Sequence, residues 1–462
     1  MAAVRPLTVA TLRSHLSLSS QPPESWPDPP NDAAYRGLAG DIVRTIEPHT
    51  EADPVALLVQ LLAAFGNAAG RASHFKVEAT RHTTNLNVVL VGETSKARKG
   101  TSWDHTRGLV RVADPEWTDA HIASGLSSGE GLIWAVRDPI EKLEREKAKN
   151  GAARYVPVVT DAGIEDKRLL VYESEFASTL RVLGRDGNTL SALIRQAWDS
   201  GDLRSLVKNS PARATGAHIS IIGHITRDEL RRYLDVTEAA NGFGNRFLWI
   251  CVRRSKLLPE GGRMHEVDVA PLVRRLSEVI EFARTADQCR FGTDARRLWH
   301  EVYPELSEGR LGLYGALTAR AEAQTIRLAL LYALLDLSSR IRAGHLRAAL
   351  ALWSYADRSV RHIFGTALGD PVADEILRAL IVAAGEGTTR TEIANLFGRH
   401  KSGAEIGRAL DLLRGHGLAI SKQERTDGRP TERWFYAGAN EANYAKEAVE
   451  EATALDGRRG AR

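Results

Sequence analysis

The stretch from Asn87 to Ser102 constrains the fold of this chain more than any other. It opens with Asn87-Val88-Val89-Leu90-Val91, an apolar and largely β-branched run that predicts a buried strand. Gly92 permits a sharp exit from that strand, and a short polar loop follows. Lys99-Gly100-Thr101-Ser102 then predicts the first turn of a helix. A buried strand that leads through a short loop into a helix is typical of a parallel α/β sheet.

The same loop has the residue types of a phosphate-binding loop. A triphosphate needs backbone N–H groups, a lysine for its terminal phosphates and a hydroxyl for Mg²⁺. Lys99 is the predicted phosphate lysine, and Thr101 or Ser102 would supply the hydroxyl. The spacing departs from the common G-x-x-x-x-G-K-[ST] pattern, because Gly100 separates the lysine from Thr101. The predicted nucleotide-binding residues of the loop are Gly92, Lys96, Arg98, Lys99, Gly100, Thr101 and Ser102. The alternative is a basic strand-to-helix turn without a ligand.

Composition excludes several other classes of protein. The 462 residues suffice for two or three domains, and 43% hydrophobic with 26% charged residues is ordinary for a globular protein. No apolar run reaches the length of a membrane span, and the first residues lack the pattern of a secretory signal. With only Cys251 and Cys289, we expect no disulfide framework, no cysteine-rich metal site and a cytoplasmic location. A net charge of +4 permits nucleic-acid binding without requiring it.

Residue patterns divide the chain into five segments. Residues 1–30 are proline-rich and predict a poorly ordered arm or linker. Residues 31–264 alternate apolar strands with helices, which predicts a doubly wound, mostly parallel core; within it, 138–167 is expected to be a charged, irregular surface insertion. Residues 265–368 are helical in pattern throughout and predict a lid subdomain. Residues 369–438 predict three helices and a β-hairpin, the order of a winged helix, and 439–462 predict a flexible tail.

The apolar strand predicted within 168–176 ends in two carboxylates. At the end of a strand beside the loop strand, Glu173 would hold Mg²⁺ through water, together with the hydroxyl of Thr101. Glu175 lies two residues after Glu173, so its side chain is expected to point to the same face of the sheet. It would be the catalytic base. The alternative is that both glutamates merely end a strand at the surface.

Glu130 is a rival catalytic carboxylate. In RecA-like ATPases such a glutamate follows a strand between the phosphate loop and the metal-binding strand. However, Ser127-x-x-Glu130 is also the pattern of a capping box, in which both side chains bind the N-terminal amides of a helix.

Two polar side chains near later strands complete the predicted catalytic set. His224, at the end of the strand 218–223, could sense the terminal phosphate or could be an ordinary hydrogen-bonded histidine. Arg246, in the glycine-framed turn before the last strand, could act as an arginine finger on a neighbouring subunit or pair with a carboxylate of its own chain.

Basic residues in the winged-helix region predict contacts with a nucleic-acid backbone. The expected recognition helix is 402–414, and a hairpin follows it. The predicted DNA-binding residues are Lys401, Arg408, Lys422, Arg425, Arg429 and Arg433. Winged helices also dock proteins, so this remains the alternative.

The order of these motifs in residues 31–365 resembles that of a family of helicase-like P-loop proteins. These proteins occur in phages, plasmids and other bacterial mobile elements, often beside primases or fused to them. The resemblance rests on four stretches: 91–102, Ser127-Ser128-Gly129-Glu130-Gly131-Leu132, Glu173-Ser174-Glu175-Phe176 and Gly244-Asn245-Arg246-Phe247. It implies a RecA-like or AAA+-like ATPase. Residues 317–329 are also similar to the lid of minichromosome maintenance helicases, which implies that Arg320 senses the nucleotide.

These patterns together predict an α/β P-loop NTPase with a helical lid and a C-terminal winged helix. The expected cofactors are ATP and Mg²⁺. The expected partners are DNA, further copies of this chain in a hexameric ring, and a primase or another mobile-element protein, because no primase module is apparent here. The leading function is a helicase-like motor in the replication of a mobile element. The alternatives are a nucleotide-switched DNA-binding regulator or anti-phage defence ATPase, and a degenerate loop with a structural role.

Overall fold

The computed structural model describes residues 26–147, 153–205, 212–234, 236–310, 312–365, 368–383, 385–424 and 430–437. The chain divides into two compact units. The first comprises Met1–Arg310 and Ala316–Gly365, and the second comprises Leu311–Gly315 and Thr366–Arg462. Most of the predicted arm, the predicted tail, and the side chains of Arg425 and Arg429 lie outside the described residues.

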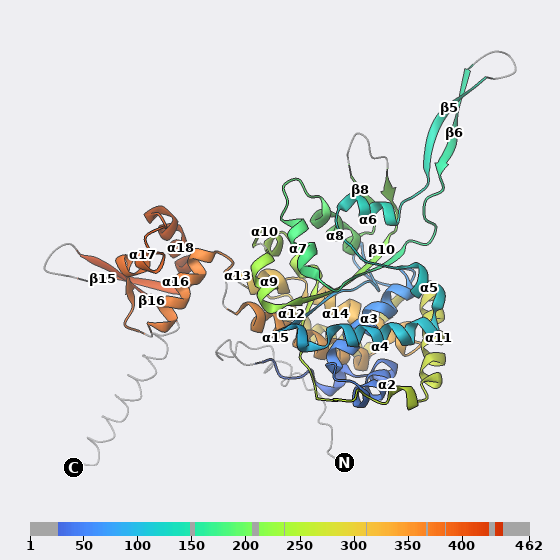
Figure 1. Ribbon diagram of the computed structural model, residues 1–462, viewed down its shortest axis with the longest axis horizontal. Helices are drawn as coiled ribbons and strands as arrows, with labels where there is room; N and C mark the ends of the chain where they lie inside the picture. Colours follow the sequence, from blue (N-terminus) through green and yellow to red (C-terminus); the bar gives the residue numbers. More distant parts are fainter. Residues whose placement is uncertain are drawn as a thin grey trace, which may run out of the picture. The chain divides into compact units, whose positions relative to one another are not determined.

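The first unit is built on a parallel sheet of five strands in the order β11-β3-β10-β7-β4 (Figure 1). Their bounds are β3 Asn87–Gly92, β4 Ile122–Ala123, β7 Arg168–Glu173, β10 His218–Thr226 and β11 Leu248–Cys251. The predicted α/β class with a parallel sheet is therefore confirmed, although β4 has only two of the six residues expected at 121–126.

Helices cover both faces of this sheet. Val88 and Leu90 point from β3 into the core on the side of α3 (Pro54–Ala69) and α4 (Lys99–Ala113). Helix α3 begins after Asp53, whose side chain accepts a hydrogen bond from the N–H of Val55, and it is buried all round because further helices lie over it. On the other face pack α7 (Phe176–Leu183) and α9 (Arg227–Tyr233).

Further helices complete the first unit. They are α2 (Gly37–Ile46), α5 (Pro115–Ala120), α6 (Gly129–Ala135), α8 (Leu190–Asp199), α10 (Val236–Ala240), α11 (Ala270–Thr285), α12 (Thr293–Leu306), α14 (Ala321–Leu335) and α15 (Ala343–Phe364), while α13 (Gly312–Thr318) crosses the boundary of the units. The helices of 265–365, predicted to be a helical lid subdomain packed on the sheet domain, belong to the same compact unit as the sheet.

Asn67 ties α3 to two strands and to α5. It is fully buried, its Nδ2 donates to the carbonyls of Leu169 and His218 at 3.0 Å, and its Oδ1 accepts from Trp117 Nε1 at 3.0 Å. Asn67→Ala is therefore expected to lower the free energy of unfolding by about 3 kcal/mol, because it leaves several buried polar groups without this partner. Urea unfolding measures the effect. The exposed Gln196→Ala should stay within about 0.5 kcal/mol of wild type, and an equal loss in both variants would refute this role.

A second sheet corrects the expectation that 265–365 is helical throughout. Its order is β13-β12-β1-β2, with β1 His74–Val77, β2 Thr80–Thr83, β12 Gln288–Phe291 and β13 Arg340–Ile341. The strands β12 and β13 are short, and each lies between two long helices. Their apolar residues therefore continue the helical pattern, which conceals them in the sequence.

The insertion predicted to be irregular contains a long β-ribbon instead. Strands β5 (Ile140–Lys147) and β6 (Ala153–Asp161) pair antiparallel and extend away from the body of the first unit (Figure 1). The sequence of β5 shows only a weak alternation of charged and apolar residues, which does not identify it as a strand. The strand signal lies in its partner β6, which is rich in residues that favour strands: Tyr155, Val156, Val158 and Val159. A second, short ribbon joins β8 (Leu203–Arg204) to β9 (Arg213–Ala214).

The second unit has the predicted order of elements with one more short strand. Helix α16 (Pro371–Val382) is followed by β14 (Thr388–Thr389), α17 (Arg390–Leu396), α18 (Gly403–Gly415), β15 (Ala419–Glu424) and β16 (Thr431–Tyr436). The strands form an antiparallel sheet in the order β14-β16-β15. Its core packs Trp434 of β16 against Ile376, Leu410 and other apolar residues of the three helices.

Candidate functional site

The carboxyl ends of the parallel strands bring several predicted residues to one edge of the sheet. Gly92 at the end of β3 pairs with Thr226 at the end of β10, and Glu173 at the end of β7 pairs with Gly223. From β3 the chain crosses towards β4, whereas from β10 it crosses in the opposite direction to β11. Ligands of open α/β sheets bind where connections diverge in this way.

Lys99 folds back over the loop that precedes it. The loop contains a short 3-10 turn at Ser95–Ala97, and Arg98, in the left-handed region at φ 57°, directs the chain into α4. The Nζ of Lys99 lies 3.4 Å from the carbonyl oxygen of Thr94, and a Cβ at Gly92 would lie 2.9 Å from that Nζ. A side chain at position 92 would therefore displace the lysine.

The electrostatics of Lys99 combine burial with two nearby carboxylates. Only 9% of its surface is exposed, and this burial lowers the pKa of Lys99, whereas Glu175 and Glu229 oppose the shift. The start of α4 has no side-chain cap, and the space above Gly100 is open. The first-turn amides of α4 and the ammonium of Lys99 are thus concentrated at one open helix end, which favours an anion.

The two other basic residues of the loop have different positions. Arg98 Nε lies 2.5 Å from Glu51 Oε2, so its guanidinium ties the loop to the turn before α3 instead of lying free for a phosphate. Glu51 also accepts a hydrogen bond from the N–H of Leu258; that bond, followed by the contact with Arg98, lowers its pKa. Lys96 is exposed on the loop.

The alternative between Thr101 and Ser102 is resolved by burial. Ser102 is completely buried; its hydroxyl donates to the carbonyl of Lys99 at 2.6 Å and accepts from Gln60 Nε2 at 2.6 Å. That hydroxyl is enclosed by its partners and cannot face a metal ion in the loop. Thr101 is exposed in the first turn of α4 and remains the predicted ligand.

The two glutamates of the 173–176 motif differ in their surroundings. Glu173 is 6% exposed, and its Oε1 accepts hydrogen bonds from the N–H groups of Gly125 and Leu126, both at 2.7 Å. It therefore holds the loop after β4 against the end of β7. Glu175 is exposed at the N-terminus of α7, close enough to Lys99 to raise the pKa of that lysine.

The capping box expected at Ser127 and Glu130 does not form. The N-cap of α6 is Ser128, whose Oγ accepts from the N–H of Gly131, one residue later than expected. Glu130 is exposed and accepts a hydrogen bond from Thr189 Oγ1 at 3.3 Å. Its carboxylate is thus not used as a cap.

His224 is joined to the start of α4 by a chain of buried side chains. Its Nε2 lies 3.0 Å from Gln60 Oε1, and Gln60 in turn donates to Ser102, which donates to the Lys99 carbonyl. Gln60 was missed in the sequence, although a single polar residue inside the apolar run 55–65 was the available signal. Glu229 was missed as well, and its signal was the capping-box spacing from Thr226.

Burial of two strand histidines predicts a loss of stability in mild acid. Burial lowers the pKa of His224 to about 3, with a smaller contribution from Lys99, and burial likewise lowers the pKa of His218 to about 3. In the unfolded chain these groups take up protons near pH 6.5, so the unfolded state gains protons first as the pH falls. Their contribution to stability is complete above pH 6.5 and is lost progressively towards pH 3.

We expect each histidine to remove about 1 kcal/mol between pH 6.5 and pH 5.5. Urea unfolding across this range measures the slope of stability against pH. In His224→Gln the slope should decrease by the share of one histidine, and an unchanged slope would contradict the assignment.

Arg246 and Arg320 lie at the opposite, amino edge of the sheet. Arg246 Nη2 is 2.5 Å and Arg320 Nη1 is 3.7 Å from the carboxylate of Asp199 at the end of α8. Beneath them Arg327 donates to the backbone carbonyls of Asn85 and Trp198. Because Asn85 precedes β3, this group is separated from Gly92 by the length of the strand, about 17 Å for six residues.

This position corrects the expectation for Arg320 and bears on the two alternatives for Arg246. Arg320 cannot sense a nucleotide in the loop of its own chain, because the strand lies between them. Arg246 pairs with a carboxylate of its own chain, which is the alternative the sequence left open. Both arginines could reach only a nucleotide held by another copy. Asp199 was missed because it lies 47 residues from Arg246 in sequence.

Only part of the predicted basic set of the second unit is available for a ligand. Arg433 Nε lies 2.9 Å from Glu424 Oε2, and its Nη1 donates to the carbonyls of Glu386 and Gly387, so it holds the hairpin to the unit's own fold. Lys401 Nζ lies 3.1 Å from Glu405 Oε1. Arg408 and Lys422 are exposed.

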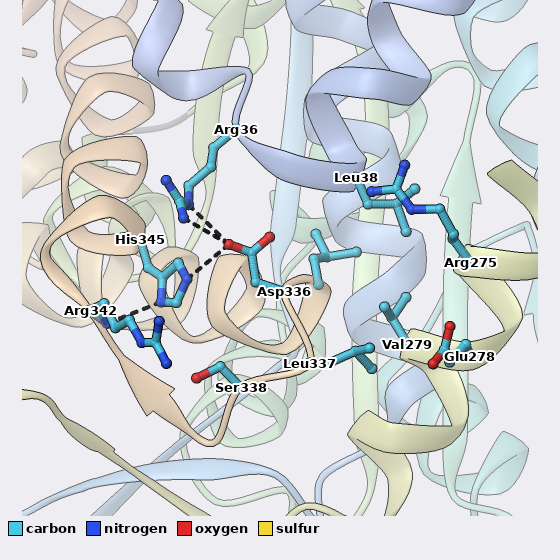
Figure 2. Close-up of a pocket in the computed structure, with 11 residues that line it drawn as sticks. Arg36, Leu38, Arg275, Glu278, Val279, Asp336, Leu337, Ser338, Arg342 and His345 are labelled. Carbon is cyan, nitrogen blue, oxygen red and sulfur yellow. Dashed lines mark hydrogen bonds and ion pairs between the residues drawn. The ribbon is translucent and has the colours of Figure 1, made fainter.

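A pocket of about 390 Å³ lies elsewhere in the first unit, between α2, α11 and the turn after α14. Figure 2 shows Asp336 at its centre, with Arg36 and His345 directed at the carboxylate and with Leu38 and Val279 forming an apolar side. Arg36 Nη2 lies 2.9 Å and His345 Nε2 lies 3.0 Å from Asp336 Oδ2. These ion pairs join α2 to α15, and none of the predicted site residues lines this pocket.

The fold and this edge define an α/β protein with a parallel sheet and a basic loop at the divergence of its strands. No protein-family model matches the chain, and no curated protein matches its sequence. In the part of the chain that the structure describes, no helix is long and apolar enough to cross a membrane. Among the same residues, no cluster of three or more histidine, cysteine or carboxylate side chains could hold a metal ion.

Proposed function

We propose that this protein binds and hydrolyses ATP with Mg²⁺ as a helicase-like P-loop motor acting on DNA. The observation that carries the proposal is the position of Lys99, which is buried over its own loop at an uncapped helix end. A buried ammonium held over open helix amides is the arrangement that binds terminal phosphates.

Each residue at this edge has a proposed role. Lys99 and the first-turn amides of α4 bind the β- and γ-phosphates, and Glu175 orients the attacking water. The donors available for Mg²⁺ are oxygens, as that ion prefers: the exposed hydroxyl of Thr101 and, through water, the carboxylate of Glu173. The bound ion would neutralise charge that develops on the phosphates.

The arrangement of the arginines supports a ring of copies of this chain. Arg246 and Arg320 are adjacent at the amino edge, whereas the proposed nucleotide lies at the carboxyl edge. A head-to-tail ring brings these opposite edges of neighbouring copies together, since each copy presents one edge to the next. We propose that the two arginines act there on the γ-phosphate of the neighbour.

The second unit supports the proposal that DNA is the substrate. Its helix order and antiparallel sheet support the proposal of a winged helix, in which α18 would enter the major groove. Arg408 is exposed on α18, and the space around the exposed Gly403 at the start of this helix is open. Lys422 on β15 would contact phosphate from the hairpin.

ATP turnover with and without single-stranded DNA tests the motor, and displacement of one strand of a forked duplex tests unwinding. Stimulation by DNA together with ATP-dependent strand displacement is the expected result. Arg408→Ala with Lys422→Ala should weaken DNA binding and reduce its salt dependence, whereas turnover without DNA should not change. Turnover absent in the wild-type chain under all conditions would refute the proposal.

A regulator that uses ATP as a slow switch is the second candidate. The separation of the DNA-binding residues into a unit of their own favours it, since a switch needs only a conformational link between the units. Such a protein binds DNA in an ATP-dependent manner without displacing a strand, so the forked-duplex assay separates the two functions.

A further inference from the structure

The amino edge of the sheet carries more buried positive charge than its neighbouring carboxylate neutralises. The side chains of Arg246 and Arg320 are 7% and 37% exposed, and Arg327 is 1% exposed. Asp199 is the one carboxylate within ion-pair distance of these three side chains among the described residues. Arg327 makes its hydrogen bonds to carbonyl oxygens and the side-chain oxygen of Asn85.

Several buried hydrogen-bond donors of the described residues at this edge also lack partners. The Nε of Arg246, the Nε of Arg327 and the indole N–H of Trp198 are buried and have no partner in the described part of the chain. All three arginines lie over the ring of Trp198, with Arg327 closest at 3.8 Å. A site with unpaired donors and surplus positive charge accepts oxygens of an anion.

Asp199 is held at a place that disfavours its charge. It is the last residue of α8, where the negative end of the helix dipole repels a carboxylate, and its side chain is 42% exposed. Arg246 and Arg320 form ion pairs with it, and Arg327 attracts it from beyond ion-pair distance. A carboxylate that is exposed, opposed by its own helix and held by ion pairs alone can be displaced by a stronger anion.

We propose that Asp199 is an intramolecular stand-in for the γ-phosphate of a neighbouring copy. In the separate chain it holds Arg246 and Arg320 together at the amino edge. When two copies meet with ATP between them, the phosphate oxygens replace the carboxylate, because guanidinium groups bind both anions in the same geometry and phosphate carries more charge. This inference rests on the proposed ATPase and names what regulates it: assembly must first release the arginines from Asp199.

If this inference holds, ATP turnover depends on protein concentration, and Asp199 determines the concentration at which turnover is half-maximal. If the arginines are held in nine chains of ten, removing the carboxylate increases the apparent affinity between copies about tenfold. The maximal turnover at high protein concentration should not change, because Asp199 does not touch the nucleotide after assembly. A residue with a merely structural role would lower the maximum without moving the midpoint.

The test compares Asp199→Asn with Glu322→Gln at saturating ATP over a range of protein concentrations. Glu322 is a matched control, since its charge also acts on Arg320 but lies beyond ion-pair distance. We expect the half-maximal concentration to fall about three- to tenfold in Asp199→Asn only. Sedimentation with a non-hydrolysable ATP analogue should show association at correspondingly lower concentration, and Asp199→Glu should resemble wild type.

An unchanged midpoint in Asp199→Asn, or an equal shift in both variants, overturns the inference. If Asp199→Asn does not fold, Asp199→Ser, which removes the charge with a shorter polar side chain, carries the same expectation. If the wild-type chain neither turns over ATP nor associates with the analogue, the proposed function itself fails. Turnover by wild type with coincident curves for wild type and Asp199→Asn refutes the role of Asp199 alone.

Discussion

Replacing Lys99 with alanine is expected to lower ATP turnover at least about a hundredfold while the chain stays folded. The ammonium of Lys99 lies over its own loop, whereas the guanidinium of Arg98 is held by Glu51. Loss of one preorganised charge at developing negative charge costs about 10²–10³ in rate. Turnover with Mg²⁺ measures the effect, and circular dichroism melting reports the fold.

The matched control for this experiment is Lys96→Ala, which removes the same side chain from an exposed position of the same loop. Its turnover should remain within a few-fold of wild type. The interpretation of the loop would be wrong if Lys99→Ala retained turnover within tenfold, or if Lys96→Ala caused the larger loss.

Glu175→Gln is expected to abolish most turnover while the chain still binds ATP. A base that orients water contributes about 10²–10⁴ in rate, and glutamine keeps the shape of the side chain without its charge. Single-turnover hydrolysis separates this loss from binding, which is measured by the rise in melting temperature with ATP and Mg²⁺. Binding should persist or strengthen, since one carboxylate that faces the phosphates is gone.

Glu130→Gln decides between the two candidate carboxylates. Glu130 accepts a hydrogen bond from Thr189, whereas Glu175 lies near enough to Lys99 to affect its pKa. We therefore expect Glu130→Gln to keep turnover within about tenfold of wild type. A greater loss in Glu130→Gln than in Glu175→Gln would assign the base to Glu130.

The carboxyl edge of the sheet was predictable because its signals are local in sequence. An apolar β-branched run, a glycine and a lysine seven residues later define β3, the loop and α4 without knowledge of any distant contact. The strand that ends in Glu173 carries the same kind of signal. These features depend on period, burial and turn chemistry, which neighbouring residues determine.

The amino edge could not be predicted in this way, because its geometry depends on pairs far apart in the chain. Nothing near Arg246 in sequence indicates Asp199, and Arg320 was assigned to the wrong edge because a resemblance fixes order along the chain, not position across a sheet. Burial likewise separates Ser102 from Thr101, although the two are adjacent and chemically similar. Ribbon β5–β6 was missed because its strands are identified by their pairing.

The β5–β6 ribbon has the form of a lever arm whose base lies at the amino end of β7, on the edge of the sheet opposite the proposed catalytic site. Its base is fixed by the ion pairs Arg137–Asp161 at 2.9 Å and Lys167–Asp138 at 3.0 Å, and Lys167 directly precedes the strand that ends in Glu173. The eight residues of β5 span about 27 Å. A rotation of about 10° at the base therefore moves the far end by about 5 Å, so a displacement too small to disturb the sheet is amplified to the rise of one helical turn.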